Sequence, residues 1–122
     1  MTTMIQDKDG VIAAVPSTKP SDRHFRNAWV FDSSHSAITE DLTAAKEIFK
    51  NKIREVRGPL LEAEDVVWMK AAEADNTSAK AASVAKKVKL RDAPANNAIS
   101  SASNITELKA AWDTSVLGTS PY

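Results

Sequence analysis

The stretch that decides the fold is LTAAKEIFKNKIREVRGPLLEAEDVVWMKAAEA, residues 42–74. Its apolar side chains recur in alternating steps of four and three, which is heptad spacing in an α-helix. Eight of the ten positions in this seam are apolar, and Lys46 and Lys70 are the exceptions. The apolar members are Leu42, Phe49, Ile53, Val56, Leu60, Ala63, Val67 and Ala74. A seam of this length predicts that the helix packs against another helical surface.

Gly58 and Pro59 interrupt the middle of this stretch. Proline has no N–H to donate to the carbonyl of Glu55, and an interior proline costs a helix about 3 kcal/mol. Two helices, at 40–57 and 59–74, are the alternative, with Pro59 in the first turn of the second. Because the heptad phase is kept across the proline, we favour one bent helix, capped by Thr39 or Asp41.

Two hairpin signals precede the long helix. The segments MIQ (4–6) and VIA (11–13) flank the polar loop DKDG, and a glycine at the end of such a loop favours a hairpin. The segments AWVF (28–31) and SAIT (36–39) flank the turn-like DSSH. Because an isolated hairpin is marginally stable in water, we expect the first one to rest on another chain.

Shorter helices follow residue 74. Asn76 can cap a helix that runs to about Leu90, APA at 93–95 ends it, and a weak helix at about 95–102 follows. Residues 104–107, NITE, have the form of a capping box before a last helix. We expect these helices to pack on Leu61 and Trp68, which would leave the main seam free for another chain.

The predicted fold is therefore mostly α with a small N-terminal β part. It comprises one or two short hairpins, a long amphipathic and Pro-kinked helix, and shorter C-terminal helices. Residues 1–22 form an extended or hairpin interaction arm, and residues 23–122 form a helical domain with a leading hairpin.

Composition limits the chemistry that the chain can perform. The 122 residues form at most one ordinary domain, and seven aromatic residues give a thin core. The formal charge is zero, so attraction to nucleic acid or to an anionic membrane is not implied. The sequence has no cysteine, which excludes disulfides, thiolate metal sites and cysteine nucleophiles. No segment approaches about 18 apolar residues, so we expect no membrane contact.

Three groups of polar residues are candidate sites. Glu62, Glu64 and Asp65 lie within one turn, and His24 and His35 are the only histidines. Without a motif spacing, both groups are typical of a solvated surface. Residues 80–91 carry five cations and no acid. Because no aromatic residue is interleaved with them, nucleic-acid binding is disfavoured. The alternative is that these cations pair with the acidic residues of the long helix. We expect no catalytic residue, no cofactor, no metal and no enzymatic activity.

Several segments, taken in their order and spacing, are similar to a known group of proteins. They are DRHFRNAW (22–29), AIT (37–39), AAKEI (44–48), KIREVRGPLL (52–61), WMKA (68–71), LRDAP (90–94) and TELKAAW (106–112). Together they resemble small proteins, and C-terminal modules, encoded among the tail genes of tailed bacteriophages. The resemblance covers roughly residues 22–112. The basic run at 86–89 and the tail after Trp112 depart from the pattern.

The resemblance implies a virion structural protein, a small tail component at the baseplate or tail-fibre attachment, and carries no catalytic residues. Its partners would be other tail proteins, and a homo-oligomer such as a trimer is expected, located in the virion and, during assembly, in the host cytoplasm. We expect the interface at Leu42, Phe49, Ile53, Val56, Leu60, Ala63 and Val67. The alternatives are a tail assembly chaperone that holds a fibre or tape-measure protein, and a nucleic-acid-binding regulator.

Overall fold

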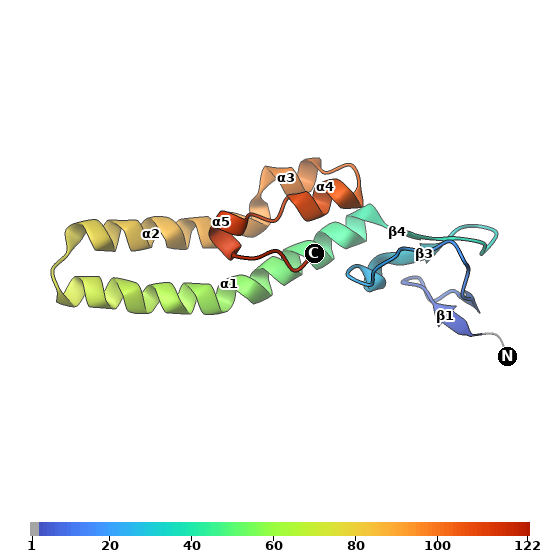
Figure 1. The fold of residues 1–122 in the computed structure, drawn as a ribbon, viewed down its shortest axis with the longest axis horizontal. Helices are drawn as coiled ribbons and strands as arrows, with labels where there is room; N and C mark the ends of the chain where they lie inside the picture. Colours follow the sequence, from blue (N-terminus) through green and yellow to red (C-terminus); the bar gives the residue numbers. More distant parts are fainter. Residues whose placement is uncertain (1–2) are drawn as a thin grey trace.

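The computed structural model describes residues 3–122. It is an elongated molecule with two β-hairpins at one end and a long helical hairpin at the other (Figure 1). The elements in chain order are β1 (Met4–Gln6), β2 (Ile12–Ala14), η1 (Arg26–Ala28), β3 (Trp29–Phe31), β4 (Ile38–Glu40), α1 (Leu42–Glu73), α2 (Thr77–Asp92), η2 (Ala93–Ala95), α3 (Asn97–Ser101), α4 (Ile105–Ala110) and α5 (Thr114–Leu117). The predicted fold class is confirmed.

The N-terminal part consists of two antiparallel strand pairs, β1–β2 and β3–β4. In the first pair Ile5 lies opposite Ala13, and Gly10 in the connecting loop has a φ of 86°, a conformation that favours glycine. The backbone N–H of Lys8 donates to the carbonyl of Trp29 at 2.9 Å, which joins the first hairpin to β3. The arm that we expected to rest on another chain thus rests on the second hairpin of its own chain.

Helix α1 is one continuous helix of 32 residues with Pro59 in its interior, so the alternative of two helices is wrong. Asp41 caps it, because its carboxylate accepts a hydrogen bond from the N–H of Thr43 at 3.2 Å. Figure 1 shows that the helix changes direction along its length. The missing N–H of Pro59 is the physical reason for a bend, and Gly58 has no Cβ to clash with the proline ring.

Helix α2 runs back along α1. Asp75 turns the chain with a φ of 52°, and the side chain of Asn76 accepts a hydrogen bond from the N–H of Ala79 at 3.0 Å. The two helices meet through small residues: Ala71 and Ser83 are buried, and the hydroxyl of Ser83 donates to the backbone carbonyl of Glu64 at 3.1 Å.

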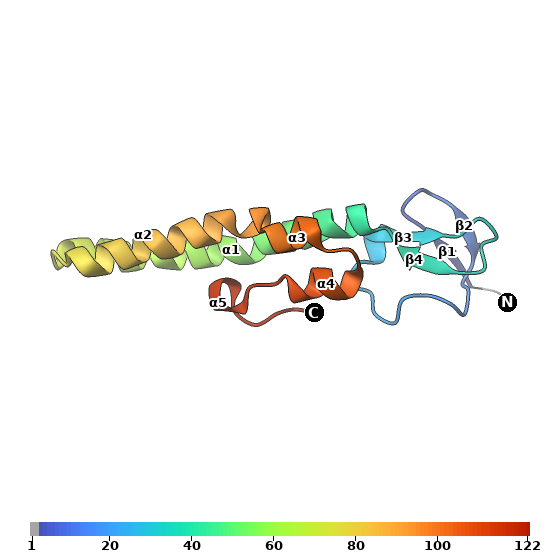
Figure 2. The same ribbon diagram turned by 90° about the horizontal axis from the view of Figure 1, so that it is seen from above.

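The segment from η2 to the C-terminus turns back over the half of α1 that follows the strands (Figures 1 and 2). Asn96, Asn104 and Asp113 cap α3, α4 and α5 in turn. The capping box at α4 is shifted by one residue, because the carboxylate of Glu107 accepts from the N–H of Ser103 rather than from that of Asn104. Helix α5 was not predicted.

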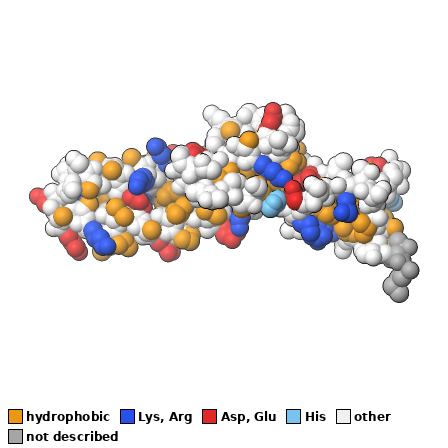
Figure 3. All heavy atoms as spheres, viewed as in Figure 1, with side chains coloured by type: hydrophobic (Ala, Val, Ile, Leu, Met, Phe, Trp, Pro, Cys, Tyr) orange, Lys and Arg blue, Asp and Glu red, His pale blue; other side chains and the backbone are white. Residues whose placement is uncertain are grey.

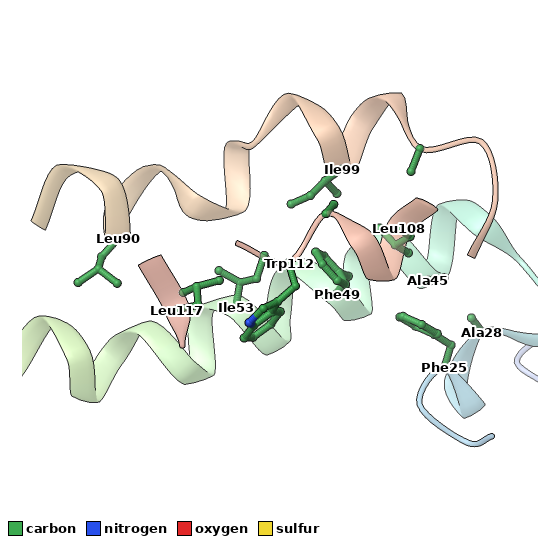
Figure 4. Packing of buried hydrophobic residues seen from close by; sticks show 12 residues of the cluster. Phe25, Ala28, Ala45, Phe49, Ile53, Leu90, Ile99, Leu108, Trp112 and Leu117 are labelled. Atoms are coloured by element: carbon green, nitrogen blue, oxygen red, sulfur yellow. The ribbon is translucent and has the colours of Figure 1, made fainter. Parts of the chain in front are cut away.

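The core lies where this segment meets α1. Leu117 and Trp112 pack over Ile53 and Phe49, while Leu90 comes from α2 and Phe25 from the linker before η1 (Figure 4). Among the helices of residues 3–122, none is long and apolar enough to cross a membrane.

Candidate partner-binding surface

The first half of the predicted seam is buried within the chain itself. Phe49 is 0% exposed and Ile53 is 1% exposed. The ring of Tyr122 stacks on Phe49 at 5.4 Å between centroids, and Trp112 meets the same ring edge-on at 5.9 Å. Tyr122 was not foreseen as a core residue, because no periodicity links a single aromatic at the end of a loop to the helix that it covers.

Three further seam residues pack against this core while partly buried, namely Leu42, Val56 and Leu60. We expected another chain to cover the seam here; instead the C-terminal segment of the same chain covers it. A heptad pattern shows that a helix face is buried against something, but it does not show whether the covering segment belongs to the same chain.

The predicted packing of the C-terminal helices on Leu61 and Trp68 is also corrected. Leu61 lies at the edge of the core, but Trp68 is 38% exposed. Val84 and Val88 of α2 are themselves exposed. The C-terminal segment reaches the seam rather than this edge, because α3, α4 and α5 return along the other half of α1.

Beyond α5, the described part of the chain offers only α1 and α2 (Figures 1 and 2). Of the remaining seam residues, Val67 is exposed there, and Ala63 is exposed beside α5, where it lines a pocket with Val116. We define the distal surface as the large apolar side chains left uncovered in this part, which are 38% to 57% exposed. They are Val66, Val67, Trp68, Met69, Val84 and Val88. Figure 3 shows hydrophobic side chains along this end of the molecule, between scattered charges.

The distal surface stays exposed for a geometric reason. Residues 66–69 are consecutive, and at about 100° per residue they point around the whole circumference of α1. One neighbouring helix covers only one side, and here it covers the side that carries Ala71. An apolar ring around a helix is expected where the helix is buried on several sides. The signal was present in the sequence as the unbroken run VVWM.

One side of the hairpin gathers several of these residues. The ammonium of Lys87 lies 5.8 Å from the ring centroid of Trp68 and forms an ion pair with Asp65. Val84, Lys87 and Val88 follow the i, i+3, i+4 spacing of one helix face. Trp68 therefore lies on the same side of the hairpin as Val84 and Val88.

The two helices of the hairpin differ in charge. Glu62, Glu64 and Asp65 lie on α1, and the cations at 80–91 lie on α2. Of the ion pairs expected between these two helices, the described residues form only the one between Lys87 and Asp65. Arg57 of α1 donates instead to the backbone carbonyl of Arg91 at 2.8 Å. Most of these charges thus remain available at the edges of the distal surface.

The other candidates do not come together. His24 packs edge-on against Tyr122, and His35 lies against Phe31 in the turn of the second hairpin. Within residues 3–122, no three His, Asp or Glu side chains are placed to hold a metal ion.

The distal surface is thus identified by its exposure and its position beyond the C-terminal cover. Exposed apolar side chains gathered on one side, as Trp68, Val84 and Val88 are here, are typical of a site that binds a protein or a membrane. No family model, no curated protein and no solved structure matches this chain.

Proposed function

We propose that this chain is a non-enzymatic protein of bacteriophage tails that acts by binding another tail protein through its distal surface. One observation carries the binding role: six large apolar side chains remain 38% to 57% exposed, Val88 beside α5 and the other five beyond the segment that closes the core. The resemblance of residues 22–112 to proteins of phage tail genes supports the setting.

The proposed mechanism is packing of helices. Apolar surface contributes about 25 cal/mol for each Å² removed from water, before the cost of ordering the partner. The side that holds Trp68, Val84 and Val88 offers exposed apolar side chains from two helices, against which a third helix can pack. Since Phe49 and Ile53 are already covered, the partner would add to a completed fold.

A tail component that stays in the virion is the first form of this proposal. A tail assembly chaperone is the second, and the closed core favours it in one respect: a chain whose core does not depend on a partner can be released intact after assembly. Mass analysis of purified particles distinguishes the two, because a chaperone would be absent from them.

Binding to the product of the neighbouring tail-fibre gene tests the proposal. A double variant, Trp68→Glu with Val84→Glu, places a charge from each helix on this side of the distal surface and is expected to weaken binding at least tenfold. Asn51→Glu adds a charge at an exposed position on the other half of α1 and serves as the matched control. Equal binding by the double variant and the control would contradict the proposal.

A further inference from the structure

The end of the molecule opposite the distal surface carries a pocket of about 400 Å³. It lies between the first hairpin, the linker that follows it, and Trp29 of β3. Its lining includes three cations, Lys19, Arg23 and Arg26, and no acidic residue. We propose that this pocket binds the carboxylate of an acidic, apolar-flanked peptide segment of another protein.

The cations are available for a ligand. Among residues 3–122, none of the three forms an ion pair within 4.0 Å. The guanidinium groups of Arg23 and Arg26 lie over the ring of Trp29, at 5.6 Å and 4.8 Å from its centroid. A guanidinium carries its N–H donors in a planar fork that matches a carboxylate. Arg26 uses one of them on the carbonyl of Gln6 at 2.7 Å.

A second observation concerns Trp29 itself. Its indole Nε1 is buried and has no acceptor among the described residues. An unpaired buried donor is costly. An oxygen of Glu40, which lies opposite Trp29 in the β3–β4 pair, is also buried without a partner among the described residues, and pairing of these two groups would satisfy both. Because Trp29 lines the pocket, its indole N–H signal reports a ligand that enters there.

The rest of the lining indicates what the carboxylate is attached to. Met4, Val15 and Pro20 form an apolar wall, and Met4 is 57% exposed. Figure 3 shows Lys and Arg side chains beside hydrophobic ones over this end of the molecule. Asp7, Asp9 and Asp22 lie close by in the sequence, outside the pocket, and they would repel a long polyanion. A single carboxylate between apolar side chains fits this mixture better than a nucleic acid does.

Titration of the full chain by NMR, following the indole N–H signals, tests the proposal. The probes are a blocked peptide ALELA, its neutral counterpart ALQLA, and ALQLA with a free C-terminal carboxylate. The Trp29 signal is expected to shift saturably with ALELA and at least tenfold more weakly with blocked ALQLA. Binding of the free-carboxylate peptide would show that a chain terminus serves as well as a side chain. Inorganic phosphate, at the same concentration, is expected to leave the signal unchanged.

Variants distinguish binding of the peptide in the pocket from a general attraction to positive charge on the protein. The double variant Arg23→Gln with Arg26→Gln is expected to abolish the shift of the Trp29 signal. Lys19→Gln, at an exposed residue, is expected to weaken binding and to leave the two guanidinium groups over the Trp29 ring in place. Lys86→Gln with Lys89→Gln removes the same charge from α2 and should bind normally. Three results would overturn the proposal. The first is an equal loss of binding in both double variants, and the second is a response to phosphate alone. The third is a Trp29 signal that changes in Glu40→Gln and does not change with peptide.

Discussion

Among single residues, Asp7 joins the two hairpins of the N-terminal part through its side chain. One carboxylate oxygen accepts from the N–H groups of Asp9 and Val11, both at 2.9 Å, and the other accepts from the N–H of Phe31 at 3.1 Å. Burial acts to raise the pKa of Asp7, but these three backbone donors outweigh it, and the pKa lies below its ordinary value of 3.8. Asp7 thus fastens the first hairpin to the second.

We predict that Asp7→Ala frees the first hairpin while the helices stay folded. The backbone amides of residues 4–14 should then exchange with deuterium markedly faster, as measured by mass spectrometry. Asp9→Ala is the matched control, since among the described residues the Asp9 carboxylate forms a hydrogen bond and ion pair only with Lys8. Because the pKa of Asp7 is lowered on folding, its stabilisation is complete above pH 3.8 and is lost as the pH falls below that value. Unchanged exchange in Asp7→Ala would contradict this role.

Tyr122 closes the core through contacts with four other rings. It stacks on Phe25 and Phe49 and meets His24 and Trp112 edge-on. We predict that Tyr122→Ala lowers the free energy of unfolding by about 2–3 kcal/mol, as expected for loss of a packed aromatic ring. Tyr122→Phe should change it little, because no hydrogen bond of the hydroxyl is present in the described residues. Urea denaturation measures both, and equal losses would contradict the packing argument.

The same residue gives the fold a dependence on alkaline pH. Burial, with a smaller effect of Glu55, raises the pKa of the Tyr122 phenol to about 12. Since the folded-state pKa is the higher one, stability should fall as the pH rises above 10, the ordinary value. Tyr122 is the only tyrosine, so tyrosinate absorbance reports it alone. If the Tyr122 phenol of the folded chain titrated with its ordinary pKa of 10, the ring would not be buried.

At the scale of elements, α1 shows which features a sequence can predict. The heptad phase correctly predicted a helix that continues through Pro59, and cap residues correctly marked the starts of α1, α2 and α4. These signals are local, because each depends on residues within one or two turns. The cover over Phe49 and Ile53 depends on contacts with residues more than fifty positions away, which no local pattern records. The distal surface was misassigned for the same reason: Trp68 was expected beneath helices that in fact lie elsewhere.

Replacement of Pro59 tests the origin of the bend. In Pro59→Ala, a new N–H can donate to the carbonyl of Glu55, and we predict a gain of about 1–3 kcal/mol in the free energy of unfolding. Glu62→Ala, at an exposed position one turn later, controls for helix propensity. A loss of stability in Pro59→Ala, measured by urea denaturation, would instead show that the packing of the C-terminal segment requires the bend.

At the scale of the whole molecule, the two halves of the seam along α1 differ in what covers them. The half of α1 near the strands is sealed by the chain's own C-terminal segment, and the other half is left with a single neighbouring helix (Figure 1). The distal surface and the basic pocket beside Trp29 lie at opposite ends. Two proposed contacts with other proteins can therefore form independently of each other.

The chain has no cysteine, so a single introduced thiol reports its own surroundings. The most direct test of this division is the rate at which Ile53→Cys and Val67→Cys react with a thiol reagent in the isolated, folded protein. We predict that the thiol at 67 reacts nearly as fast as in the unfolded chain, and that the thiol at 53 reacts at least a hundredfold more slowly. Equal, fast reaction at both positions, with helical circular dichroism intact, would contradict the claim that the chain covers its own seam.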